Sequence, residues 1–240
     1  MTVYFISDLH LNGQSPTLTA LWRHFLGTYA KPGSVIYILG DFFDVWLGDD
    51  AADAFQKSIM SDLKQLTDSG VPVYFMVGNR DFLIGPQFAA ETGVILLKDP
   101  TVLDWPTMRV LLKHGDDLCV QDQRHQWFRR ISRSWLIRHA YLALPLKFRR
   151  SIADYLRRHS RGNRGYSVLL DADREAVKNK LSQAKADVLI HGHTHRPGID
   201  IFFQKNQRTT RYVLSDWHEQ GNFLRLNPLH GFEICYFATT

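Results

Sequence analysis

Short apolar runs recur along the chain, separated by polar segments that contain Gly, Asp or Asn. The runs are rich in Val, Ile, Tyr and Phe, the residues that fit best on the pleated surface of a sheet. We therefore expect β-strands at 3–6, 35–39, 73–77, 110–113, 188–191, 211–214, 223–226 and 233–237.

Between the first three expected strands, the apolar residues follow a helical period instead. A helix beginning at Pro16 is predicted from the stripe formed by Leu18, Leu21 and Phe25. The same spacing predicts a second helix over 55–66. An alternating βαβαβ start followed by strand-dense sequence indicates an α/β fold, with two packed sheets flanked by helices.

Residues 121–165 have a different pattern. They contain twelve Lys or Arg and only two Asp or Glu, whereas the rest of the chain is net acidic. Apolar residues recur there at helical spacing in two stretches separated by Pro145: Phe128, Ile131 and Trp135, then Phe148, Ile152, Tyr155 and Leu156. We expect a helical insert whose other faces carry Arg129, Arg130, Arg133, Arg149, Arg150, Arg157 and Arg158. A localised excess of positive charge indicates an anionic partner.

Composition excludes several classes of protein. The 240 residues are 45% hydrophobic and 22% charged, which is ordinary for a globular domain. The two cysteines are far apart, so a disulfide framework is not expected. The longest apolar runs are far shorter than the roughly 18–20 residues of a membrane span. We therefore expect a cytoplasmic protein that does not cross a membrane.

Five polar clusters directly follow expected strands, at 7–10 (SDLH), 40–44 (GDFFD), 78–81 (GNRD), 114–116 (HGD) and 191–195 (HGHTH). Loops at the carboxyl ends of strands are where α/β folds place their chemistry. A mixed Asp, Asn and His set suits divalent ions such as Mn²⁺, Fe²⁺ or Zn²⁺. Residues two apart in extended chain point the same way, so the members of D-x-H and H-x-H pairs can converge on one centre.

Each cluster has an ordinary structural explanation when it is taken alone. Asp41 could be a turn or helix-cap residue, and His114 could be a hydrogen-bonded core histidine. Chance does not account well for five such clusters in this order, all at strand ends. A glycine also precedes three of the candidate ligands, which lets the backbone turn sharply. We therefore predict a metal site formed by Asp8, His10, Asp41, Asn79, His114, His193 and His195.

The ordered motifs D-x-H, G-D-x-x-D, G-N-R-D, a later histidine and G-H-x-H resemble the calcineurin-like metallophosphoesterases, and the similarity runs from Asp8 to His195. The resemblance implies an αββα sandwich of two sheets with two bound metal ions. It further implies that the first ion is held by Asp8, His10 and His195, the second by Asn79, His114 and His193, and both by Asp41.

Arg80 stands where many members of this family carry a histidine. Arginine stays charged in proteins, so it cannot protonate a leaving group, but it can bind phosphate oxygens in a bidentate manner. The site therefore favours a substrate whose leaving group departs without a proton, such as one phosphate of a diphosphate.

The longer strings FISDLHL, YILGDFFDVWLGDD, GNRDFLIG, HGDDLC, ALPLKFRRSIA and LIHGHTHRP closely resemble the UDP-2,3-diacylglucosamine diphosphatases of lipid A assembly, over essentially the full length. The resemblance implies one domain over 1–240 that hydrolyses UDP-2,3-diacylglucosamine to UMP and 2,3-diacylglucosamine 1-phosphate. Mn²⁺ is the implied metal, and water would attack the phosphorus on the uridine side. The implied location is the cytoplasmic face of the inner membrane, with the insert at 121–165 capping the acyl chains.

The same resemblance implies a set of substrate contacts: Asn79, Arg80, Asp122, Ser160 and His193. The chain departs from the family after Ser160, where it is about two residues shorter and the family's lysine has no clear counterpart. Asn163 and Arg164 are the expected substitutes. Other polar or aromatic residues near the clusters are expected to support the loops: Asp44, Asp49, Asp81, Asp116 and Trp217.

Three other functions remain open. A nuclease on the same metal scaffold would use the basic insert to bind nucleic acid. A hydrolase of small nucleotides would have little use for Trp127 and Trp135. A binding module on a decayed phosphoesterase fold is disfavoured because every candidate ligand is present. The insert itself could be a helical cap with solvated arginines, but an amphipathic helix with Trp on one side and Arg on the other also suits a lipid surface. We expect neither a nucleic-acid partner nor an obligate protein partner.

Overall fold

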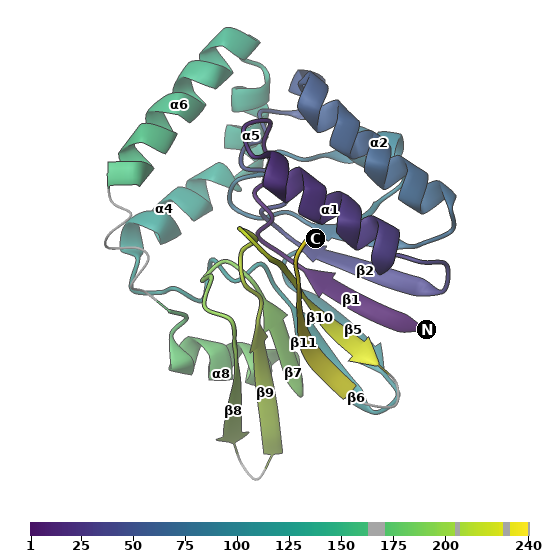
Figure 1. Ribbon diagram of the computed structural model, residues 1–240. Helices are drawn as coiled ribbons and strands as arrows, with labels where there is room; N and C mark the ends of the chain where they lie inside the picture. Colours follow the sequence, from purple (N-terminus) through teal and green to yellow (C-terminus); the bar gives the residue numbers. More distant parts are fainter. Residues whose placement is uncertain (163–170, 205–206, 228–230, 240) are drawn as a thin grey trace.

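The computed structural model describes residues 1–162, 171–204, 207–227 and 231–239 (Figure 1). Within these residues, the first sheet has the strand order β11-β10-β1-β2-β3-β4. Strands β1 to β4 run parallel, β10 pairs antiparallel with β1, and β11 pairs antiparallel with β10. The strands are β1 (Thr2–Ile6), β2 (Ser34–Leu39), β3 (Val73–Met76), β4 (Ile95–Leu97), β10 (Gly221–Asn227) and β11 (Gly231–Phe237).

The second sheet has the order β5-β6-β7-β9-β8 in the described part of the chain. Its central strands β6, β7 and β9 are parallel, whereas β5 and β8 pair antiparallel with their neighbours. The strands are β5 (Thr101–Trp105), β6 (Met108–Leu112), β7 (Val188–His191), β8 (Gly198–Gln204) and β9 (Gln207–Val213).

The central strands β1, β2 and β7 are buried on both faces. In β1, Val3 and Phe5 point into the core between the two sheets, while Tyr4 and Ile6 point into the core beneath the helices. In β7, Ile190 faces the first sheet and Leu189 faces the opposite way. Burial on two faces explains why these strands are apolar runs without a polar alternation.

Helices cover the outer face of each sheet. The first sheet is covered by α1 (Pro16–Thr28), α2 (Ala54–Asp68) and α3 (Pro86–Thr92), and the second by α8 (Arg174–Ala184). A short 3-10 helix, η1 (Asp49–Ala51), precedes α2. The predicted αββα sandwich is confirmed, as are all eight predicted strands and the helices at 16 and 55–66. The helices α3 and α8 and the strands β4, β5 and β8 were not predicted.

In its described residues, the insert contains the helices α4 (Gln123–Ser132), α5 (Trp135–Leu142) and α6 (Leu146–Gly162). They lie beyond one end of the sandwich, between β6 and α8 in the chain (Figure 1). The predicted stripe of Phe128, Ile131 and Trp135 does not lie on one helix, because α4 ends at Ser132 and Trp135 begins α5. None of the helices in the described ranges is long and apolar enough to cross a membrane.

Three insert arginines do not lie on a solvated face, so the alternative of a cap with solvated arginines does not hold for them. Arg149 is only 4% exposed, and its guanidinium binds the Asp50 carboxylate and the Leu47 carbonyl at the edge of the main fold. Arg129 and Arg133 bind the buried Asp116 carboxylate at 2.9 and 3.0 Å. The carboxylates and the carbonyl that these arginines contact fix their side chains. The ion pairs therefore hold the insert to the sandwich.

Replacing Arg149 should destabilise the protein more than replacing its neighbour Arg150, which is exposed. Arg149→Ala removes charge-assisted hydrogen bonds, each of which contributes about 1.5–3 kcal/mol to stability. We expect its melting temperature to fall by several degrees, and that of Arg150→Ala to stay near the wild-type value. Equal melting temperatures for the two variants would show that the Arg149 contacts do not hold the insert.

Candidate dimetal centre

The candidate ligands share an uncommon backbone conformation. Non-glycine residues rarely adopt positive φ, and those that do concentrate at functional sites, where the surrounding fold holds them in place. Among the described residues, six non-glycine residues have positive φ, and five of them are candidate ligands: Asp8, His10, Asp41, His193 and His195. These sharp turns at the strand exits direct the side chains toward one another.

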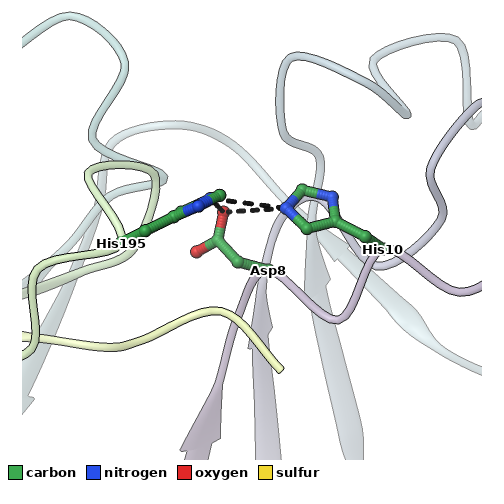
Figure 2. A group of neighbouring side chains, drawn as sticks. All are labelled: Asp8, His10 and His195. Atoms are coloured by element: carbon green, nitrogen blue, oxygen red, sulfur yellow. Dashed lines mark hydrogen bonds and ion pairs between the residues drawn. The ribbon is translucent and has the colours of Figure 1, made fainter. Parts of the chain in front are cut away.

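The first group of ligands is formed by Asp8, His10 and His195 (Figure 2). The Nε2 atoms of the two histidines lie 3.3 Å apart, and the His195 Nε2 lies 3.3 Å from the Asp8 Oδ1. Asp8 is fully buried, and its other oxygen accepts hydrogen bonds from the Ser7 hydroxyl and from the His193 backbone N–H. One carboxylate oxygen is therefore fixed by the fold and the other faces the two imidazoles.

The second group is formed by Asp41, His114 and His193. The His114 Nε2 lies 3.0 Å from the Asn79 Oδ1 and 3.7 Å from the Asp41 Oδ1, so Asn79 belongs to the same cluster. The His114 Nδ1–H donates to the Leu39 carbonyl, at 2.9 Å. This hydrogen bond leaves Nε2 as the ring nitrogen that can bind a metal. The structure thus brings all seven predicted residues together at one end of the sandwich, and their roles as ligands stay predictions.

Asp216 orients His195 from behind. The His195 Nδ1 lies 3.1 Å from the Asp216 Oδ2, which leaves Nε2 directed at Asp8 and His10. Carboxylates commonly hold metal-binding histidines in this way. Asp216 was not predicted to take part in the site, although it follows an expected strand at 211–214, the same signal that identified the other clusters.

The charges of the centre favour a bound cation. Burial disfavours the charged imidazolium of His195, but the nearby Asp216 and Asp8 carboxylates favour it more strongly. Together these effects raise the pKa of His195 to about 10. Burial lowers the pKa of His10, and burial together with His114 holds the pKa of His193 well below its usual value. The buried carboxylates favour a positive charge, and the lowered pKa of His10 and His193 keeps those two imidazoles neutral, as ligands of a divalent ion must be. The residues present therefore fit two divalent ions.

Two glycines allow the loops to approach closely. A Cβ at position 78 would lie 2.2 Å from the Asp41 Oδ1, and a Cβ at position 192 would lie 2.0 Å from the Asp8 Oδ2. Any side chain at these positions would displace the carboxylates. Glycine at positions 78 and 192 therefore lets the ligand loops pack against the two carboxylates.

Residues expected to support the loops make such contacts. Asp81 accepts hydrogen bonds from the backbone N–H groups of Phe42 and Gly78, at 2.8 and 2.6 Å, and so joins two ligand loops. The Asp49 carboxylate accepts from the backbone at the start of α3, and Asp116 holds the insert arginines. Asp44 binds the Arg80 guanidinium, and the backbone of buried Trp217 donates to the Asp8 carbonyl.

The predicted substrate contacts are described to different extents. The Arg80 guanidinium lies 3.6 Å from the Asp41 carboxylate and 2.5 Å from that of Asp44, at the rim of the centre. Asp122 caps α4, because its carboxylate accepts from the His125 backbone N–H. Ser160 lies in α6, and Asn163 and Arg164 lie outside the described residues.

The sequence model of the calcineurin-like phosphoesterase family matches residues 1–197. The chain belongs to this family. Its relatives named UDP-2,3-diacylglucosamine hydrolase include a protein of Coxiella burnetii that is 44% identical over 97% of this chain and 96% of its own length. Those of Pseudomonas aeruginosa and Serratia proteamaculans are 42% and 40% identical, each over 95% of both chains. The likeness therefore includes the insert as well as the metal motifs. Like other members of its family, the chain is a phosphoesterase with candidate dimetal-binding residues.

Gly78→Ala should impair the centre without unfolding the protein. The added methyl group would push Asp41 away, and displacing a catalytic group by about 1 Å can lower turnover by about a hundredfold. We expect weaker Mn²⁺ binding by calorimetry and a loss of phosphoesterase activity of that order. Gly27→Ala is the matched control, because a Cβ in that α1 position meets nothing within 4 Å. Wild-type metal binding by Gly78→Ala would contradict the close packing around Asp41.

Proposed function

We propose that this chain hydrolyses the diphosphate bond of UDP-2,3-diacylglucosamine, giving UMP and 2,3-diacylglucosamine 1-phosphate. The observation that carries this proposal is the combination of two ligand groups with Arg80 at their rim. Such a centre can bind a charged diphosphate and needs no proton donor for the leaving group. Relatives of the same name, 40–44% identical over nearly the whole chain, support the choice of substrate.

Each of the two proposed metal ions would have its own ligands. Asp8, His10 and His195 would hold one ion, Asn79, His114 and His193 the other, and Asp41 would join them. The donor set of imidazole, carboxylate and amide groups suits Mn²⁺, which is the metal we propose. Two divalent ions bound there would lower the pKa of water and neutralise charge on the phosphoryl oxygens.

Arg80 would bind the diphosphate. Its guanidinium is about one-third exposed and directed across Asp41, so it can donate to phosphate oxygens from the open side of the centre. The leaving group, a sugar 1-phosphate, departs as an anion, which a guanidinium can stabilise. It does not need a proton, so no imidazolium is required as a proton donor. Arginine at this position therefore favours an anhydride over a simple alkyl phosphate.

The insert would bind the acyl chains. Large apolar side chains are exposed on its three helices, and two of them, Trp127 and Trp135, are each 67% exposed. Trp127 and Phe128 also line an open hollow of about 450 Å³ on α4, together with Gln123 and Arg124. So much exposed apolar surface indicates contact with a lipid or a protein. A diacylated substrate would provide a lipid contact. The other exposed apolar residues on these helices are Leu136, Ile137, Phe148, Ile152, Tyr155 and Leu156, and Leu144 lies in the turn between α5 and α6.

The same surface would let the chain work at the cytoplasmic face of the inner membrane, where its substrate resides. Exposed Arg130, Arg150 and Arg158 lie on the insert beside these apolar residues. Basic residues near an anionic bilayer contribute roughly 1 kcal/mol each to binding, and salt weakens this attraction. Attachment would therefore be peripheral and would need neither a protein partner nor nucleic acid.

A substrate panel tests the proposed function. With Mn²⁺ the wild type should cleave UDP-2,3-diacylglucosamine strongly, deacylated UDP-glucosamine weakly, and neither a cyclic nucleotide nor single-stranded DNA. In ¹⁸O-labelled water the label should appear in UMP, because attack is proposed at the phosphorus on the uridine side. Equal turnover of the acylated and deacylated substrates, or rapid cleavage of DNA, would count against a lipid substrate.

The double variant Trp127→Ala/Trp135→Ala extends this test to the insert. It should lower kcat/KM for the diacylated substrate by about tenfold, because burial of large apolar side chains drives acyl binding. Turnover of the deacylated substrate should hardly change. Phe203→Ala is the matched control, since this aromatic residue is 76% exposed but lies on β8. An unchanged preference for acyl chains would remove the insert from substrate binding.

Arg80→Ala should lower kcat/KM without loss of metal. A charge-assisted hydrogen bond contributes on the order of 1.5–3 kcal/mol, which corresponds to roughly tenfold to a hundredfold in kcat/KM. Arg80→Lys keeps the charge but not the bidentate geometry, so its activity should lie between that of the wild type and that of Arg80→Ala. Steady-state kinetics and metal analysis of the purified variants provide the measurement. If Arg80→Ala lost its metals, Arg80 would support the centre and would not bind substrate.

A further inference from the structure

His125 brings the insert to the dimetal centre. It lies in the first turn of α4, where the capping Asp122 carboxylate accepts its backbone N–H. The His125 ring lies 5.1 Å from that of His193, and the His193 ring lies 5.1 Å from that of His114. Three imidazoles from three separate parts of the chain thus stand in a row, and His125 is the outer member.

The His125 side chain has an unused hydrogen-bonding atom. Its Nε2 is buried and has no hydrogen-bond partner among the residues that the structure describes. Buried polar atoms in folded proteins are nearly always paired with protein, water or a ligand. Yet His125 is in neither of the two groups whose ligand atoms lie within 4.8 Å of one another, as far as the described residues go. The ring therefore lies beside the metal groups without joining them.

The position of His125 is fixed by contacts on the same helix. Arg129 and Arg133, one and two turns further along α4, bind the Asp116 carboxylate. The Gln126 side chain donates to the Asp116 carbonyl, at 2.7 Å. Because Asp116 is two residues beyond His114, these contacts hold α4 against the very loop that carries a candidate ligand. His125 is thus held rigidly, as a residue that positions a substrate must be.

We propose that His125 binds substrate, donating its Nε2–H to a non-bridging oxygen of the diphosphate. This inference rests on the proposed function, which places a diphosphate at the centre. A neutral imidazole can donate this hydrogen bond, so no change of protonation is involved. The contact would join the insert, which handles the acyl chains, to the phosphates, and would hold both ends of the substrate in register.

Two substitutions separate hydrogen bonding from packing. His125→Phe keeps an aromatic ring against His193 but removes the donor, whereas His125→Gln keeps an N–H donor at similar reach. We expect His125→Phe to lower kcat/KM for UDP-2,3-diacylglucosamine by about tenfold to a hundredfold, with two Mn²⁺ still bound per chain. His125→Gln should recover most of the loss. His24→Ala, a histidine of α1 outside the insert, should keep the wild-type kcat/KM.

Calorimetry with uridine diphosphate on the Mn²⁺-loaded protein tests the contact without turnover. Weaker binding by His125→Phe, restored in His125→Gln, would support it even if the wild type failed to cleave UDP-2,3-diacylglucosamine, a result that would refute only the proposed function. Wild-type kinetics and binding in His125→Phe would overturn the inference. Loss of Mn²⁺ from His125→Phe would overturn it as well, because His125 would then serve to pack His193.

Discussion

The hydrogen bond between the Asp8 carboxylate and the His193 backbone N–H is the contact on which the site depends. Asp8 follows β1 of the first sheet and His193 follows β7 of the second, so this 2.8 Å contact sets how closely their loops approach. It forms only because residue 192 is glycine. Since the carboxylate is fully buried, a shift of either sheet would remove this donor and leave the hydroxyl of the neighbouring Ser7, so the buried charge would be less well satisfied. The packing of the two sheets therefore also determines the positions of the candidate metal ligands.

Burial also explains which parts of the fold could be predicted. The eight predicted strands include all the central ones, and the apolar runs of β1, β2 and β7 result from burial on both faces. The three that were missed, β4, β5 and β8, lie at sheet edges, where side chains are partly exposed and the pattern is mixed. On β8, for example, Ile201 is 44% exposed beside the buried Phe202. The apolar pattern of a strand reflects burial, so it is weakest in an edge strand, which pairs on one side only and is partly exposed to solvent.

The candidate site was predictable to the extent that its residues follow buried strands. The seven expected ligands do so, and the glycines beside them mark loops that pack tightly. His125 has no such signal, because it lies in a helix and reaches the centre only through the way the insert folds back. The place of Ser160 likewise depends on the path of the insert, because it lies in α6. Proximity of this kind is a tertiary property that local spacing does not encode.

The arginines of the insert illustrate why charge in a sequence has two meanings. Arg149 and Arg150 are adjacent and chemically identical, yet one is buried against Asp50 and the other is exposed. A guanidinium buried with its partners holds the insert in place, whereas an exposed one contributes to the field that an anionic surface meets. Net charge of the segment counts both kinds equally. The positive charge that the insert could offer to a membrane is therefore smaller than the composition suggests, and apolar contacts would have to supply more of the proposed attachment.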